Sequence, residues 1–280
     1  MPQAPAFERL LKRDRAITVA GLLVLCALAW LYILTGAGLG KSAWEMTSLS
    51  LFPYRAAMAS GGAMTAMGMV AAPTMWGLDV WLLTIAMWWV MMIAMMAPSA
   101  APAILLYARV HRHAQGQTQD GVAPTGAFAA GYLLAWLGFS LAAAASYWAL
   151  EQGGLVSAMM MGSSSRWLSG GVLIAAGAYQ FSPLKGLCLA QCRAPASFLT
   201  RHWRPGAAGA VRLGMLHGVH CVGCCWMLMA LLFVGGVMNL AWIALLALLV
   251  LAERAAPAGQ WIGRACGGVL IAWGLATFLV

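Results

Sequence analysis

Long uninterrupted apolar runs are the feature that most constrains how this chain can fold. A helix needs about 20 apolar residues to cross the roughly 30 Å hydrocarbon core of a bilayer. The runs cover residues 16–35, 78–97, 127–150, 167–181, 209–234, 240–252 and 262–278, of which the fourth and sixth are short. They are continuous rather than alternating, which favours helices over membrane strands. The sequence therefore predicts an all-α, polytopic transmembrane helical bundle of about seven spans.

The composition agrees with this class. Of the 280 residues, 63% are hydrophobic and only 8% are charged, as expected for a chain that crosses a bilayer repeatedly. We interpret residues 1–280 as one integral membrane domain, with a Met-rich outer connection at 36–77 and six further spans within 78–280. The lipid bilayer is the expected partner, and the net charge of +9 does not indicate nucleic acid, because its distribution has another explanation.

The positive charges are distributed unequally between the two sides of the predicted bundle. With the N-terminus inside, thirteen of the sixteen Lys and Arg residues fall in inner connections, and only Lys41, Arg55 and Arg166 fall outside. An excess of cations in cytoplasmic loops is typical of membrane proteins, so we expect the N-terminus inside and the C-terminus outside. Lys185 and Glu253 lie near predicted span ends and are expected at the interface.

The run 209–234 contains an unusual concentration of metal-binding side chains. His217, His220, Cys221, Cys224 and Cys225 fall within nine residues. On a helix they are joined by i,i+3 and i,i+4 spacings and project into an arc of roughly 140°. Thiolate and imidazole donors suit Cu(I), Zn(II) and other thiophilic ions. This face is predicted to bind a metal, and further ligands must come from other helices.

Candidate ligands occur at a similar predicted depth on two other segments. Cys188 and Cys192 follow the fourth run at the inner edge, and Met91 and Met95 belong to a methionine stripe on the second run. The predicted topology brings these side chains and the His217–Cys225 face to the inner half of the bilayer. Sequence alone does not establish that they touch.

The outer connection is rich in methionine, notably at Met64, Met67 and Met69. Thioether ligands favour Cu(I) and persist where thiolates would oxidise. Donors therefore grade from thioether outside to thiolate inside, which favours copper, Cu(I), over zinc or another thiophilic metal. The gradient is compatible with inward passage of copper, or with docking of an exported metal-binding partner at the outer methionines.

Four short motifs carry a resemblance to a known family. They are MMAP at 95–98, YQFSPLK at 179–185, CLAQCR at 188–193 and CVGCCW at 221–226. In combination they resemble the domain-of-unknown-function 2182 family, described generically as predicted metal-binding integral membrane proteins of bacteria. The resemblance covers roughly residues 81–255. It implies a bacterial inner (cytoplasmic) membrane location and a bound metal, but no particular reaction.

The sequence thus favours metal uptake, transfer or delivery, most readily of copper, with no catalytic residues assigned. One alternative is an enzyme, a membrane thiol–disulfide oxidoreductase, because Cys221 and Cys224 form a C-x-x-C pair of the kind used in redox exchange. A second alternative is a structural or assembly subunit of a larger membrane complex, in which the cysteines and histidines serve packing alone.

Overall fold

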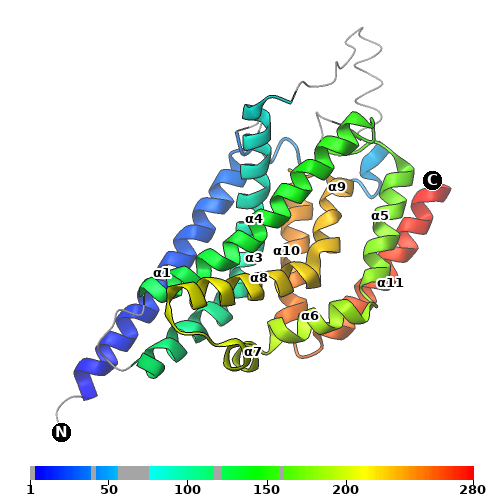
Figure 1. Cartoon of the computed structure of the whole chain (residues 1–280). Coiled ribbons are helices and arrows are strands. Elements are labelled where there is room, and N and C mark those ends of the chain that lie inside the picture. Colours follow the sequence, from blue (N-terminus) through cyan, green and yellow to red (C-terminus); the bar gives the residue numbers. More distant parts are fainter. Residues whose placement is uncertain (1–3, 39–41, 56–75, 116–121, 158–160) are drawn as a thin grey trace.

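The chain is predominantly helical, as Figure 1 shows. The computed structural model describes residues 4–38, 42–55, 76–115, 122–157 and 161–280. The elements within these ranges are α1 (Ala4–Leu34), α3 (Leu78–Gln115), α4 (Val122–Gln152), β1 (Val156–Ser157), β2 (Gly162–Ser163), α5 (Arg166–Tyr179), α6 (Pro183–Arg193), α7 (Pro195–His202), α8 (Gly206–Ala230), α9 (Leu232–Gly235), α10 (Leu240–Ala255) and α11 (Gly259–Leu279). The two short strands pair antiparallel. The predicted all-α class is confirmed.

Within the described residues, five helical segments are long and apolar enough to cross a membrane. They are Ala16–Leu34, Leu78–His111, Pro124–Gln152, Gly206–Gly235 and Gly259–Leu279. The remaining two predicted runs are helical but short: α5 has 14 residues and α10 has 16. α5 reaches spanning length only together with α6, from which it is bent by 63°. The count of seven spans therefore stays a prediction.

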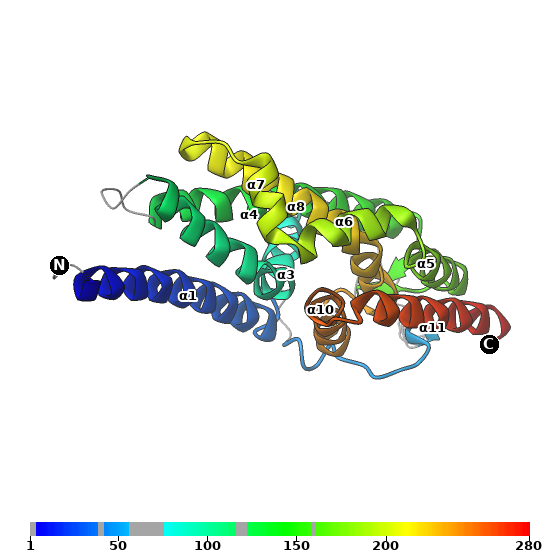
Figure 2. The same ribbon diagram turned by 90° about the horizontal axis from the view of Figure 1, so that it is seen from below.

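The bend between α5 and α6 is encoded at Ser182-Pro183. The Ser182 hydroxyl accepts a hydrogen bond from the backbone N–H of Leu184 at 3.2 Å, and Pro183 occupies the first turn of α6. A serine N-cap followed by proline is a strong start signal for a new helix. Because of this start, α6 turns across the bundle and passes beside α8, as both views show (Figures 1 and 2).

Close packing of α4 against α8 brings side chains of α4 next to the face of α8 that carries the cysteines and histidines. Gly214 and Gly218 form a small-xxx-small pair on α8, the pattern that lets membrane helices approach closely. A methyl group on Gly214 would collide with the carbonyl oxygen of Phe128 on α4. The close approach brings Tyr132, one turn further along α4, next to the cysteines of α8.

Segments predicted to share a side of the membrane meet in the structure. At one end, the Asn239 amide donates to the Ser48 carbonyl at 2.8 Å, and Arg55 donates to the carbonyl of the C-terminal Val280 at 2.6 Å. At the other end, Arg193 of α6 donates to the Ala256 carbonyl at 2.7 Å, between α10 and α11. These contacts place Ser48, Arg55, Asn239 and Val280 at one end of the bundle and Arg193 and Ala256 at the other, while the orientation and the number of spans stay predictions.

Candidate metal centre

Three cysteines of α8 form a buried sulfur cluster. Cys221, Cys224 and Cys225 expose 0%, 2% and 1% of their surface, and all three are free thiols. Cys224 and Cys225 each donate to the backbone carbonyl of Cys221, at 3.1 and 3.0 Å. The three sulfurs therefore lie on one face of the helix, as the i,i+3 and i,i+4 spacings predict.

Arg254, from the last turn of α10, reaches into this cluster. Its Nη2 donates to Cys221 Sγ at 2.9 Å and to Cys224 Sγ at 3.1 Å, while Nη1 donates to Ser99 Oγ on α3 at 2.7 Å. Two sulfurs thus converge on one guanidinium nitrogen. The sequence pattern places Arg254 only among the basic residues of the inner connections and assigns it no contact with the cysteines. An arginine ending an apolar run, where charge is costly, is the signal that could have revealed it.

Tyr132 and Met96 complete the cluster on its α3–α4 side. The Tyr132 hydroxyl is hydrogen-bonded to Cys221 Sγ at 3.1 Å and donates to the Met96 carbonyl at 3.2 Å. Met96 also brings its Sδ to 3.9 Å from Cys225 Sγ. The predicted methionine ligands Met91 and Met95 are buried on the same helix. Within the described part of the chain, no hydrogen-bond contact joins either of them to the cysteines, so Met96 is the better-placed thioether.

The two cysteines of α6 face the same site. Cys188 Sγ lies only 2.8 Å from the position that a Cβ on Gly223 would occupy, so the absence of a side chain at Gly223 lets this sulfur approach α8. Cys192 interacts with Cys224 through its side chain. The expected approach of α6 to the Cys221–Cys225 face is therefore present.

The two histidines have different surroundings. His217 is buried among aromatic rings of Phe128, Tyr132 and Phe198, at centroid distances of 5.4–6.1 Å. Its Nδ1 has no hydrogen-bond partner among the described residues, which is unusual for a buried polar atom. His220 is partly exposed, and its Nδ1 is hydrogen-bonded to the Leu216 carbonyl at 2.7 Å. Of the two, His217 has the ring nitrogen that is free to bind a ligand.

The donor set fits a soft monovalent ion better than zinc. Structural zinc sites are closed by four Cys, His or carboxylate ligands. Within the ranges that the structure describes, no three His, Cys, Asp or Glu side chains form a group that could hold an ion. Cu(I) accepts as few as two thiolates, and the Cys221 and Cys224 sulfurs already converge on one point. The predicted outer ligands Met64, Met67 and Met69 lie outside the described residues.

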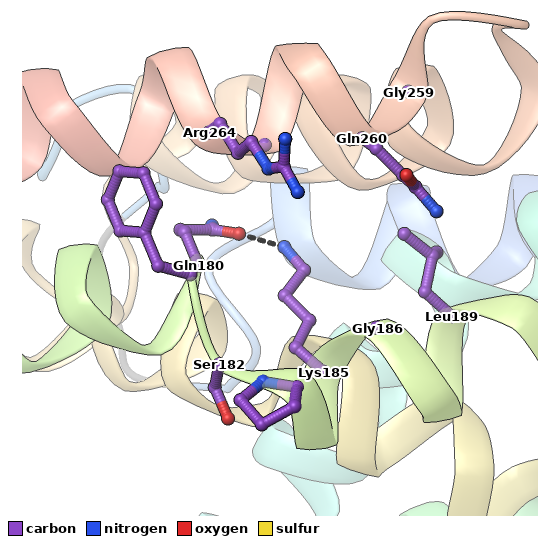
Figure 3. Close-up of a pocket in the computed structure, with 11 residues that line it drawn as sticks. Gln180, Ser182, Lys185, Gly186, Leu189, Gly259, Gln260 and Arg264 are labelled. Carbon is purple, nitrogen blue, oxygen red and sulfur yellow. Dashed lines mark hydrogen bonds between the residues drawn. The ribbon is translucent and has the colours of Figure 1, made fainter.

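A second buried polar group joins α6 to α10, and Figure 3 shows its Lys185 and Gln180 side chains. Lys185 of α6 pairs with Glu253 of α10 at 2.7 Å and also donates to Gln180, with only 3% and 2% of Lys185 and Glu253 exposed. Lys185 and Gln180 line a cavity of about 310 Å³ that extends along α11 to Arg264. The expectation that Lys185 and Glu253 are interfacial side chains is wrong, because each finds its counter-charge inside the bundle.

A family model described as PpoB2, copper chaperone, matches residues 85–277, which is more than half of the chain. The chain belongs to this copper chaperone family. No curated protein and no solved structure matches it. The metal relation implied by the sequence motifs is thus confirmed, although the matching family does not carry the designation used for that resemblance.

The range that matches the copper chaperone family includes the sulfur cluster but not the N-terminal part of the chain. It begins within α3 and includes every cysteine of α6 and α8 as well as Arg254. It leaves out α1 and the predicted outer connection at 36–77 with its methionines. The buried sulfur cluster therefore belongs to the part of the chain that defines the family.

Proposed function

We propose that this chain is a membrane-embedded copper chaperone that binds Cu(I) through the thiolates of Cys221 and Cys224. The observation that carries the proposal is the convergence of these two buried sulfurs on one guanidinium nitrogen, at 2.9 and 3.1 Å. A small ion that displaced this nitrogen from between the two sulfurs would have both of them as ligands, with the guanidinium next to it, and soft thiolates select Cu(I). The copper chaperone family supports the choice of metal.

The neighbouring donors provide a route by which copper is handed over. Cys192 and Cys188 approach the pair from α6, and Met96 approaches from α3 through its contact with Cys225. Exchange between sulfurs that are already adjacent needs no free ion in the apolar interior, where a bare cation is costly. His217, with its unpartnered Nδ1, is an additional donor one helical turn from Cys221.

The proposed setting is the bacterial inner membrane, with this site in its inner half. Five helical segments have the length and composition to cross a bilayer, and the excess of basic residues in the predicted inner connections sets the orientation. In this arrangement Met64, Met67 and Met69 collect copper on the outer side or dock an exported metal-binding partner, and the thiolates retain or deliver it inside. The outer methionines and the partner are carried by the sequence pattern alone.

The test is Cu(I) titration of the full chain, purified in detergent. The variant is Cys221→Ser with Cys224→Ser, and the matched control is Cys26→Ser with Cys266→Ser, since both of these cysteines also lie in apolar helices and are free thiols. We expect the control to bind copper as the wild-type chain does and the first variant to lose this site. Unchanged binding by the Cys221/Cys224 variant would remove the proposed site.

A thiol–disulfide oxidoreductase is the second candidate, because Cys192 and Cys224 come together from different helices. Redox function requires that metal-free protein form a disulfide that a dithiol reductant reverses. Mass mapping of such a bridge, together with failure of the Cu(I) titration, would favour this second function over the first.

A further inference from the structure

Arg254 is a partly buried cation whose Nε is fully buried, and its choice of partners is unusual. Its hydrogen bonds go to the Ser99 hydroxyl, the Cys221 carbonyl and the cysteine sulfurs, and its Nε has no partner among the described residues. No carboxylate bonds to it within the described part of the chain. A buried charge without a counter-charge costs several kcal/mol. Cys221 and Cys224 are the groups in contact with the guanidinium that can supply a balancing negative charge, once a bound ion has replaced their protons.

The other groups around the cluster leave this charge unbalanced. The Lys185–Glu253 pair, from α6 and α10, is neutral as a unit. α4 contributes the Tyr132 hydroxyl, and α3 contributes the uncharged Ser99 and Met96. On α8, Cys225 Sγ lies farther from the guanidinium, at 4.0 Å, than the sulfurs of Cys221 and Cys224 do, and histidine binds metals as neutral imidazole. On α6, Cys188 and Cys192 are free cysteines, and no hydrogen bond joins them to Arg254 among the described residues. The charge of a loaded site is then set by two thiolates, Arg254 and the ion.

On the basis of the proposed function, we infer that Arg254 selects the charge of the ion, favouring monovalent soft ions over divalent ones. Two thiolates with a monovalent ion carry one negative charge, which the guanidinium cancels. The same thiolates with a divalent ion are already neutral, so Arg254 leaves one net positive charge in the apolar interior, which is unfavourable. Selectivity would then come from charge balance in addition to ligand softness.

The inference is tested by measuring the affinities of Ag(I) and Cd(II), two thiophilic ions that differ in charge and do not change oxidation state. The variants of the full chain are Arg254→Gln, which removes the charge, and Arg254→Lys, which keeps it. Arg264→Gln is the matched control, because it removes one positive charge from the same end of the molecule, on α11, where Arg264 stacks on Trp261.

We expect Arg254→Gln to shift the ratio of affinities toward Cd(II) by at least about tenfold, since one unit charge a few ångströms away is worth several kcal/mol at intermediate dielectric. Arg254→Lys and Arg264→Gln should keep the wild-type ratio to within a few-fold. A wild-type ratio in a folded Arg254→Gln protein would overturn the inference.

If Arg254→Gln does not fold, Arg254→His supplies the comparison within one protein, because histidine changes charge between about pH 5 and 8. As the pH rises, this histidine loses its charge, so the ratio of affinities should move toward Cd(II) more than it does in Arg254→Lys at the same pH values. An equal change of the ratio with pH in the two variants would overturn the inference. Loss of the proposed function has a different signature: Ag(I) would bind equally well to Cys221→Ser with Cys224→Ser.

Discussion

Glu253 and Arg254 are consecutive residues of α10 with opposite charges, but their side chains have different kinds of partner. Glu253 is paired with Lys185, so its charge is balanced within the protein. Arg254 turns instead to the sulfurs of Cys221 and Cys224, whose charge depends on their protons and on the ion they bind. The Lys185–Glu253 pair is neutral in itself, so its role is to hold α6 and α10 together. Arg254 has no carboxylate partner among the described residues, and in the proposed function its charge is balanced by the two thiolates and the ion that they bind.

The first prediction concerns the loss of the cation from the Lys185–Glu253 pair. Lys185→Met would leave Glu253 buried without a partner, and such a loss costs about 3–5 kcal/mol. Adding Glu253→Leu should restore most of the stability. Thermal unfolding of the metal-free protein in detergent measures both effects, and equal stability of the wild-type chain and the single variant would show that the pair is not a structural connection.

The second prediction concerns Tyr132, which is hydrogen-bonded to one of the two cysteines that contact Arg254. Tyr132→Phe removes a hydroxyl that is hydrogen-bonded to Cys221 Sγ at 3.1 Å. In the proposed loaded site Cys221 is a thiolate, so the hydroxyl donates to it instead of to the Met96 carbonyl. A hydrogen bond to a charged group contributes about 1.5–3 kcal/mol, so the Cu(I) affinity of the variant should fall by about tenfold or more. Competition with a Cu(I) chelator of known affinity measures the change. Trp136→Phe, one turn away on α4, is the control, because its indole nitrogen has no partner among the described residues.

The third prediction separates binding from hand-over. Gly223→Ala would place a methyl group against Cys188 Sγ, so α6 must shift slightly away from α8. Because the obstructing atom is a side-chain sulfur, stability should change by about 1 kcal/mol or less. Equilibrium affinity for Cu(I) should stay nearly the same, while stopped-flow release of copper to a chelator should slow. Unaltered release would mean that α6 takes no part in transfer.

The smallest effect on the purified protein is expected at the outer methionines. Replacing Met64, Met67 and Met69 together with Leu keeps hydrophobic volume but removes the thioethers, so Cu(I) affinity at the buried site should not change. Cellular copper accumulation at limiting copper should fall. Normal accumulation with the triple variant correctly inserted would remove the import direction and leave the buried site to stand alone.

The helices and the common face of the α8 cysteines could be predicted from the sequence because both are local patterns. Continuous apolar runs require helices in a bilayer, and the spacing of Cys221, Cys224 and Cys225 fixes their common face whatever the helix packs against. The approach of α6 followed from chain connectivity, since only the short helix α7 separates it from α8.

The partners of the charged residues could not be predicted in the same way. Whether Lys185, Glu253 and Arg254 lie at the interface or inside the bundle depends on how α6 and α10 are rotated, which no local pattern determines. The same reason explains why Met96, rather than Met91 or Met95, contacts a cysteine, because adjacent stripes on one helix look alike until its neighbours are placed.

The most direct measurement is X-ray absorption at the copper edge of the loaded, full-length protein. The account predicts Cu(I) in a sulfur-dominated environment in the wild-type chain and in Cys26→Ser with Cys266→Ser. That signal should be absent from Cys221→Ser with Cys224→Ser. Copper surrounded by nitrogen and oxygen alone, or an unchanged sulfur signal after loss of both thiols, would contradict the assignment of the buried thiolate pair as the copper site.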